Sequence, residues 1–354
     1  MVSLEITTKR FIGLQHPVFI IAEIGQNHQG SVDEAKKLID AARLAGVDCV
    51  KLQKSSLEDK FTKHALERPY SSKHSWGETY GQHKQYLEFS DDEFKELKSY
   101  AERQNLLFTA SAKDCKSLKF LQELDVPFIK IGSGDADDHF LLLEAARCGK
   151  PLIISTGMQD IDNVRRVYNK VKKHHNNFAL LHCVSSYPTD YEDVNLRVIQ
   201  TYRNEFPDIP IGYSGHELGI AVPVAAVALG ATIIEKHITL DKSQKGNDHQ
   251  CSLTPEEFRT MICNIRATEQ AIGDGVKKFT SSEMHCYNKL GKSVVAAKDL
   301  VRGISIEESD LKIKVSHPSG IPAKEFEYLI GAKLRRDINY DEPLMPEDVD
   351  FLDR

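Results

Sequence analysis

The sequence lacks paired cysteines, long apolar runs and an excess of positive charge. Its seven cysteines are an odd, scattered set without a C-x-x-C motif, a pattern that indicates free thiols rather than a zinc cluster or a disulfide framework. No apolar run approaches the roughly 20 residues that span a bilayer, and residues 1–17 carry charges without the apolar core of a signal peptide. The net charge of −6, with acids and bases interspersed, provides no basic surface for nucleic acid. We therefore expect a cytoplasmic protein that binds neither nucleic acid nor membranes.

The most prominent feature present is an alternation of short apolar strands with amphipathic helices, repeated eight times. The predicted strands are FIIAEIG from Phe19, VDCVKLQ from Val47, LLFTAS from Leu106, FIKIGS from Phe128, PLIIST from Pro151, FALLHCV from Phe178, IPIGYS from Ile209 and TIIEKH from Thr232. This alternation predicts an α/β protein with a parallel sheet, and eight repeats favour a (β/α)8 TIM barrel. An open doubly wound sheet is the alternative. It requires a glycine-rich dinucleotide-binding turn after the first strand, and the GQNHQG found there is not one.

The chain is longer than one barrel, which typically needs about 250 residues, so a second domain is expected. The predicted barrel covers residues 1–273. Residues 274–291 are polar, lack clear periodicity and are typical of a linker. Residues 292–354 carry short β-like runs separated by Gly and Pro, which predicts a small β-rich domain of roughly the minimum size for its own core.

Polar residues stand at the C-terminal ends of the predicted strands, where a parallel barrel has its mouth. Because side chains alternate along a strand, Glu235 and His237 share one face of the last strand. A single such residue is more often a hydrogen-bonding group than a catalyst, but eight at the same ends indicate an active site. These eight residues are Glu23, Lys51, Lys130, Ser155, Ser214, His216, Glu235 and His237.

Two kinds of binding chemistry are indicated. His216 and His237, from neighbouring strands, can hold a divalent ion such as Mg²⁺, Mn²⁺ or Zn²⁺ while leaving positions open for water and substrate oxygens. Lys51 and Lys130, with serines nearby, suit a phosphate or a carboxylate, because ammonium groups supply charge and hydroxyls supply directional donors. A Schiff-base aldolase mechanism on one of these lysines is the main alternative. The serines are Ser133, Ser155, Ser185 and Ser214.

Several long motifs resemble the sialic acid synthase family, and the tail resembles the SAF (antifreeze-like) domain of that family. In the barrel the motifs are IIAEIGQNHQGS from Ile20, VKLQK from Val50, ERPYSSKHSWGETYG from Glu67, IKIGSGD from Ile129, ISTGM from Ile154, PIGYSGHELGIA from Pro210 and EKHITLDKSQKGNDH from Glu235. In the tail they are KLGKSVVAAKDLVRGISI from Lys289 and LIGAKLRRDINYDEPL from Leu329. The resemblance spans nearly the whole chain.

This resemblance implies a condensation of phosphoenolpyruvate with the open-chain aldehyde of an N-acylmannosamine, in which water is consumed and phosphate is released. It implies that His216 and His237 hold the metal, Mg²⁺ or Mn²⁺. It implies acid/base or supporting roles for Glu23 and Glu235, with Lys51 at the reacting centre. Phosphoenolpyruvate would be held by Lys51, Lys130, Ser133, Ser155, Ser185 and Ser214. It also implies a homodimer in which the tail of one chain covers the barrel mouth of the other.

The sugar contacts implied by the resemblance are Gln53, Tyr187 and Asp248, together with Asp135, which stands where bacterial members have glutamate. Ser185 likewise replaces their asparagine. A long excursion from Lys54 to Ser90 follows the second predicted strand and carries Lys60, Lys63, Arg68, Lys73 and Lys84. Loops of this length are usually functional. We expect Arg68 and Lys73 to bind a second phosphate at the far end of the sugar.

The expected substrate is therefore N-acetylmannosamine 6-phosphate, and the expected product is N-acetylneuraminate 9-phosphate. Two alternatives stay open. One is a synthase that acts on unphosphorylated N-acetylmannosamine. The other is a non-catalytic binding protein in which the antifreeze-like tail is the functional part and the barrel is a scaffold.

Overall fold

The computed structural model describes residues 2–351 of the 354-residue chain. The chain forms two compact units, residues 1–274 and 275–354, and each is described here by itself. No helix in the described part of the chain is both long and apolar enough to span a membrane.

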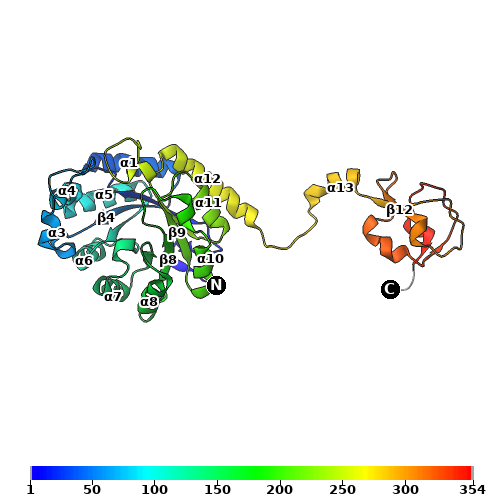
Figure 1. Cartoon of the computed structure of the whole chain (residues 1–354), viewed down its shortest axis with the longest axis horizontal. Helices are drawn as coiled ribbons and strands as arrows, with labels where there is room; N and C mark the ends of the chain where they lie inside the picture. Colours follow the sequence, from blue (N-terminus) through cyan, green and yellow to red (C-terminus); the bar gives the residue numbers. More distant parts are fainter. Residues whose placement is uncertain (1, 352–354) are drawn as a thin grey trace. The chain divides into compact units, whose positions relative to one another are not determined.

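The first unit is a closed barrel of eight parallel strands surrounded by helices (Figure 1). Each strand pairs with the next, and β10 closes the ring on β3 through parallel pairing from Ile233↔Phe19 to His237↔Glu23. The strands are β3 (Phe19–Gly25), β4 (Cys49–Lys54), β5 (Leu107–Ala112), β6 (Ile129–Ile131), β7 (Leu152–Ser155), β8 (Phe178–Cys183), β9 (Ile211–Gly215) and β10 (Ile233–His237). The predicted TIM barrel is thus confirmed, and the open-sheet alternative is wrong.

The helices of the repeats pack their apolar faces on the outside of the barrel and form the larger hydrophobic core. They are α1 (Val32–Ala45), α5 (Asp91–Arg103), α6 (Cys115–Glu123), α7 (His139–Arg147), α8 (Ile161–Lys172), α10 (Val198–Glu205), α11 (Ala221–Ala228) and α12 (Pro255–Ile272). Their ends follow local sequence signals. In α1, Ser31 caps the N-terminus by accepting from the Glu34 amide, and Gly46 ends the helix in the left-handed conformation.

The long excursion after β4 folds into three short helices outside the ring, α2 (Leu57–Lys60), α3 (Lys63–Glu67) and α4 (Tyr80–Leu87) (Figure 1). Aromatic packing holds it together: Trp76 stacks on Tyr86 with ring centroids 5.5 Å apart, and Tyr70 lies edge-on to Tyr80 at 5.4 Å. A further short helix, α9 (Tyr191–Val194), follows β8.

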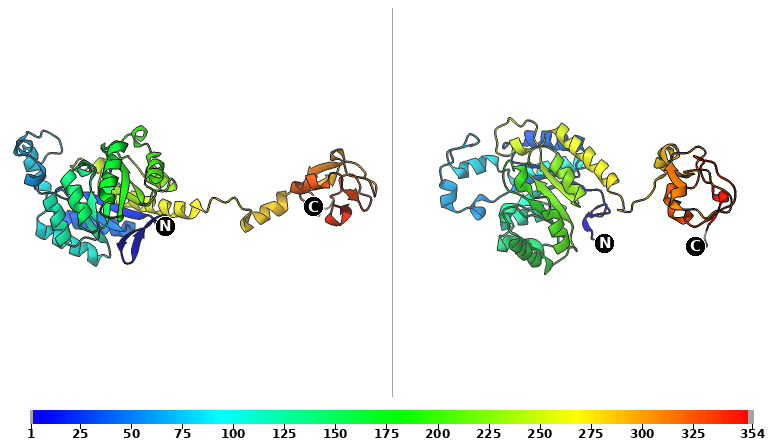
Figure 2. Two further views of the ribbon diagram at one scale, coloured as in Figure 1. Left: turned by 90° about the horizontal axis from the view of Figure 1, so that it is seen from below. Right: turned by 45° about the vertical axis from the view of Figure 1, so that its right-hand side comes forward.

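An N-terminal hairpin, β1 (Leu4–Thr7) and β2 (Arg10–Ile12), precedes the first barrel strand and lies at one end of the barrel (Figure 2). Its buried Leu4 and Ile12 cluster with Phe19 and Phe128, whose rings meet edge to face at 5.9 Å. This layer fills the N-terminal end of the barrel interior. The polar residues of the interior are therefore confined to the opposite end.

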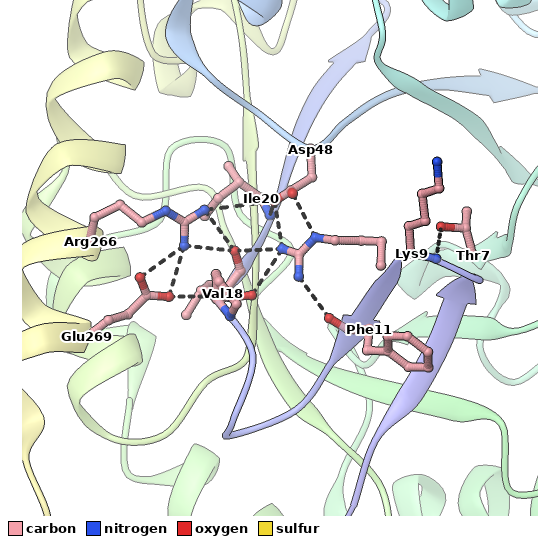
Figure 3. Close-up of polar contacts among 10 residues, drawn as sticks. Thr7, Lys9, Phe11, Val18, Ile20, Asp48, Arg266 and Glu269 are labelled. Carbon is pink, nitrogen blue, oxygen red and sulfur yellow. Dashed lines mark hydrogen bonds and ion pairs between the residues drawn. The ribbon is translucent and has the colours of Figure 1, made fainter.

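A network of ion pairs and hydrogen bonds connects the elements at the N-terminal end of the barrel (Figure 3). The Arg10 guanidinium donates to both Asp48 carboxylate oxygens, at 2.8 and 3.0 Å, and Asp48 also accepts from the Ile20 amide at 2.8 Å. Arg266 of α12 donates to the Val18 carbonyl at 3.1 Å. The network joins the hairpin, the first barrel strand and the last helix, which is where the ring closes.

The second unit contains helix α13 (Met284–Leu290) and two small antiparallel sheets. Its strands are β11 (Ser293–Ala296), β12 (Leu311–Lys314), β13 (Lys333–Leu334) and β14 (Val349–Asp350). Buried residues such as Val294, Leu311, Ile338 and Leu344 give it a hydrophobic core of its own. Helix α13 lies in the segment expected to be an irregular linker. All of its side chains are exposed, including those of Met284, Tyr287 and Leu290, so the helix buries no apolar face among the described residues.

Candidate active site

A cavity of about 300 Å³ opens at the C-terminal ends of the barrel strands. The structure brings thirteen of the predicted site residues to its wall, and their roles stay predictions. They are Glu23, Lys51, Gln53, Lys130, Ser133, Asp135, Ser155, Ser185, Tyr187, Ser214, His216, Glu235 and His237. Three others lie outside the lining. Arg68 and Lys73 are exposed on the excursion, and Asp248 lies just beyond the wall, 3.9 Å from His237.

Strand alternation explains why these side chains meet. Residues i and i+2 of a strand point to the same side of the sheet. On six strands, one inward-facing side chain belongs to the apolar layer at the N-terminal end of the barrel, and the side chain two positions later lines the cavity. The six pairs are Ile21 and Glu23, Cys49 and Lys51, Phe128 and Lys130, Ile153 and Ser155, Leu181 and Cys183, and Ile233 and Glu235. The barrel interior is thus an apolar floor below a polar chamber.

The chamber contains a buried ionic cluster. Lys51 Nζ lies 2.5 Å from Glu23 Oε2 and 3.5 Å from Glu235 Oε1, and it donates to Ser111 Oγ at 3.0 Å. Lys130 Nζ lies 3.9 Å from Glu235 Oε1 and donates to Ser155 Oγ at 2.7 Å. All of these groups are almost fully shielded from solvent. Two ammonium groups and two carboxylates therefore sit together with serine hydroxyls around them.

Burial and the neighbouring charges shift the pKa values of Lys51, Lys130 and Glu235. Burial acts against the charged form of Lys51, but the attraction of Glu23 and Glu235 outweighs it, so the pKa of Lys51 is raised. Burial and the neighbouring Lys51 charge together lower the pKa of Lys130 despite the attraction of Glu235. The pKa of Glu235 is lowered, because Lys130 and Lys51 overcome the effect of burial. Lys51 and Glu235 are therefore both charged at neutral pH when no substrate is bound.

A second set of donors lies beside the cluster and suits an anion. The Gly157 amide donates to Ser133 Oγ at 3.0 Å, and Ser185 Oγ is buried without a hydrogen-bond partner among residues 2–351. A Cβ on Gly157 would lie 2.3 Å from Ser185 Oγ, so only glycine allows the backbone to approach these hydroxyls. The unpartnered Ser185 hydroxyl and the nearby Lys130 ammonium are groups that a phosphate would engage.

The two histidines form the third part of the site. The rings of His216 and His237 are 5.5 Å apart, and Tyr187 packs 4.0 Å from His216. His216 Nδ1 lies 2.7 Å from the Val184 carbonyl, which can only accept, so the proton is on Nδ1 and the Nε2 lone pair is free. Burial lowers the pKa of both histidines, which keeps the rings neutral as metal ligation requires.

These residues fit a divalent ion held by two imidazoles. His237 Nδ1 is buried and without a hydrogen-bond partner among the described residues. No group of three or more His, Cys, Asp or Glu side chains arranged for a metal occurs in the part of the chain that the structure describes. The remaining positions would therefore belong to water and substrate oxygens.

Several cavity residues were not predicted as site residues. Ser111 and Cys183 stand at strand ends with the right parity, two positions after Thr109 and Leu181, so strand alternation could have identified them. Lys113 follows the end of β5 in the same way. Met158 has no such signal, because it lies in the loop after β7.

Comparisons with known proteins agree with this arrangement. The NeuB family model matches residues 38–277, and the SAF domain model matches residues 291–350. N-acetylneuraminate-9-phosphate synthase of Homo sapiens is 51% identical over 348 residues, which cover 98% of this chain and 97% of the human protein. The same enzyme of Drosophila melanogaster is 49% identical over 352 residues, covering 93% of this chain and 95% of the fly protein.

A solved structure is similar as well. The N-acetylneuraminic acid (sialic acid) synthetase of Leptospira borgpetersenii, crystallised with citrate, superimposes with a TM-score of 0.72 at 33% identity and covers 81% of this chain and 98% of its own. The family resemblance drawn from the sequence motifs is therefore confirmed: the chain belongs to the NeuB family, with a SAF domain following the barrel in the sequence.

Proposed function

We propose that this protein condenses phosphoenolpyruvate with N-acetylmannosamine 6-phosphate to give N-acetylneuraminate 9-phosphate, releasing phosphate. The observation that carries the proposal is the buried cluster of Lys51, Glu23, Glu235 and Lys130 beside two neutral imidazoles in one chamber. Such a chamber suits an enol substrate with two anionic groups and an aldehyde partner. The names of the relatives support the same reaction.

In this mechanism the two lysines and the serines hold the carboxylate and phosphate of phosphoenolpyruvate and orient its C3 toward the aldehyde carbon of the sugar. The enol π electrons form the C3–C1 bond, and the aldehyde C=O π bond breaks to leave an alkoxide. Water then adds to the electron-poor C2, and the proton that it gives up ends on this alkoxide. The C2–O bond to phosphate breaks as the C2 hydroxyl becomes the ketone, and the hydroxyl proton leaves with phosphate. Glu235 Oε2 is buried without a hydrogen-bond partner among residues 2–351, so it is free to receive the proton that the attacking water gives up. Lys51 balances the charge of both carboxylates throughout.

The proposed cofactor is Mg²⁺ or Mn²⁺, with His216 Nε2 and His237 Nδ1 as its protein ligands. The free lone pair on the first ring and the unpartnered nitrogen on the second support this assignment. When bound, the ion supplies Lewis-acid polarisation of the aldehyde oxygen. For the sugar, Gln53 and Tyr187 line the cavity and Asp248 lies just outside it, so contacts to hydroxyl groups are proposed for all three.

The test is phosphate release from phosphoenolpyruvate with a panel of phosphorylated and free sugars. We expect N-acetylmannosamine 6-phosphate to be preferred. Equal kcat/KM for the phosphorylated and free sugar would establish the unphosphorylated-sugar alternative instead. No phosphate release with any sugar, together with inhibition of ice growth by residues 285–354, would establish the binding-protein alternative.

Two further properties are proposed with the function. The first is a homodimer in which the tail of one chain covers the barrel mouth of its partner, which would keep water out of the reaction chamber. Static light scattering tests it, and a fully active monomer would contradict it. The second is a cytoplasmic location, supported by seven free cysteines, three of them buried.

A further inference from the structure

Two lysines meet at the rim of the cavity, and a third lies close enough to interact with both of them electrostatically. Lys60 ends α2 and Lys84 lies in α4, both on the excursion, whereas Lys113 directly follows β5. All three are half-buried, and Lys60 and Lys113 line the cavity. Lys60 Nζ also donates to the Lys113 carbonyl at 3.4 Å, which places the two residues side by side.

These lysines have too few carboxylate partners. Lys60 pairs with Asp135. Lys113 Nζ donates to the uncharged Gln53 amide oxygen at 2.6 Å, and Lys84 Nζ donates to the Gln26 amide oxygen at 3.1 Å. Within residues 2–351 no carboxylate lies within ion-pair distance of either Lys84 or Lys113. Three ammonium groups thus share one paired carboxylate, an arrangement that is unfavourable when partly buried.

The pKa values of Lys113 and Lys84 agree with this shortage of carboxylate partners. Burial, together with repulsion from Lys84 and Lys60, lowers the pKa of Lys113 to about 8. Burial lowers the pKa of Lys84 as well, with Lys60 adding to the effect, and Asp248 and Glu88 only partly oppose it. The more distant carboxylates therefore do not neutralise the rim, and a bound dianion would.

The rim is connected to the reaction chamber through one side chain. Gln53 accepts from Lys113 and donates through Nε2 to Glu23 Oε1 at 2.9 Å, and Glu23 in turn pairs with Lys51. Gln53 thus bridges Lys113 at the rim and the Glu23–Lys51 pair of the chamber. A substrate bound at Gln53 can have its reacting end in the chamber and an anionic group at the rim.

We infer that Lys60, Lys84 and Lys113 form the subsite for the terminal phosphate of the sugar and determine the preference for a phosphosugar. This inference rests on the proposed function. It replaces the expectation that Arg68 and Lys73 bind that phosphate, because the Arg68 guanidinium instead lies 4.2 Å from the centre of the Tyr80 ring and Lys73 is exposed away from the cavity lining.

The experiment compares Lys84→Met and Lys113→Met with the unmodified enzyme, using N-acetylmannosamine 6-phosphate and N-acetylmannosamine as parallel substrates. The readout is the ratio of the two kcat/KM values. We expect each variant to lower this ratio at least about tenfold, mainly through the KM of the phosphosugar, because each removes a charge-assisted phosphate contact. Lys63→Met, an exposed lysine on the same excursion, is the matched control and should leave the ratio unchanged.

A binding measurement separates this inference from the proposed function. With saturating phosphoenolpyruvate in the deep site, calorimetric binding of inorganic phosphate should be detected in the unmodified enzyme and weakened in both variants. An enzyme that turns over the phosphosugar while Lys84→Met and Lys113→Met keep the normal ratio would overturn the inference alone. If the ratio of kcat/KM values falls in Arg68→Ala and Lys73→Ala instead, the phosphate binds to those two residues and the inference is wrong. If no sugar is turned over, the proposed function is wrong. In that case, normal phosphate binding by both variants would also overturn the assignment of the phosphate subsite to these lysines.

Discussion

Replacing Lys51 by Met should destabilise the barrel strongly, and more so at high pH than at low pH. The ammonium of Lys51 lies 2.5 Å from Glu23 and 3.5 Å from Glu235, and both carboxylates are almost completely buried. The substitution keeps an apolar chain of similar length but removes the positive charge. Lys130, 3.9 Å from Glu235, is then the nearest remaining cation in this cluster.

The size of the effect follows from the burial of the charges. Removing one partner of a buried ion pair typically costs about 3–5 kcal/mol, since the other charge stays buried and uncompensated. The variant can reduce this cost by protonating a carboxylate. Its folded state then binds one proton more than the unfolded state, so its free energy of unfolding rises as the pH falls, by about 1.4 kcal/mol per pH unit.

The unmodified protein should behave differently over the same range. The pKa of Glu235 is lowered in the folded state, so the stability that this carboxylate contributes is fully present above its unfolded pKa and is lost only at more acidic pH. Between pH 8 and pH 6 its contribution is constant. The difference in unfolding free energy between the two proteins should therefore shrink as the pH is lowered from 8 to 6.

The assay is urea unfolding followed by circular dichroism at pH 8, 7 and 6. Lys51→Met combined with Glu23→Gln is the internal control and should recover much of the loss, because one uncompensated charge is removed. Lys95→Met, which breaks the exposed pair with Asp92, should have little effect. A Lys51→Met protein with normal stability at pH 8 would refute the view that this cluster is a coupled buried network.

Four further outcomes are expected. A chelator should abolish turnover and Mg²⁺ or Mn²⁺ should restore it, and His216→Ala or His237→Ala should remove most activity without unfolding the barrel; full activity of metal-stripped His237→Ala would contradict the metal assignment. Borohydride with phosphoenolpyruvate or sugar should trap no adduct by mass spectrometry on Lys51 or Lys130, whereas the Schiff-base alternative requires one. The kcat/KM for the phosphosugar should fall from pH 7 to pH 9 as Lys113, with a pKa of about 8, loses its proton, and Lys113→Arg should flatten that part of the profile. Lys51→Met and Lys130→Met should each raise the KM for phosphoenolpyruvate or lower kcat in steady-state assays, because each removes a cation from the anion site.

The ring and the chamber were predictable from the sequence because both follow from periodicity. Eight strands of known parity are enough to place Glu235 and His237 on the inner face of β10, with Lys51 and Lys130 in the same chamber. Their ion pairs and hydrogen bonds were not predictable, because they depend on the register between neighbouring strands. That register sets Glu23 opposite Lys51, for example.

The outer part of the site was less predictable. The excursion carries many charges, and the sequence gives no reason to prefer Lys60 and Lys84 over Arg68 and Lys73. The aromatic contacts of Trp76 with Tyr86 and of Tyr70 with Tyr80 hold the excursion together, and in this arrangement Lys60 lines the cavity whereas Arg68 lies over the Tyr80 ring. Contacts between side chains of an irregular segment leave no periodic signature.

The charged network at the closing point of the barrel has a consequence for folding kinetics. Pairing of β10 with β3 joins residues from the two ends of the barrel sequence, so the cost of loop closure must be met before this pairing contributes to stability. Contacts that form late in folding act mainly on the unfolding rate. The bond of Arg266 to the Val18 carbonyl spans this closure, so we expect it to slow the opening of the ring and to contribute little to the speed of its assembly.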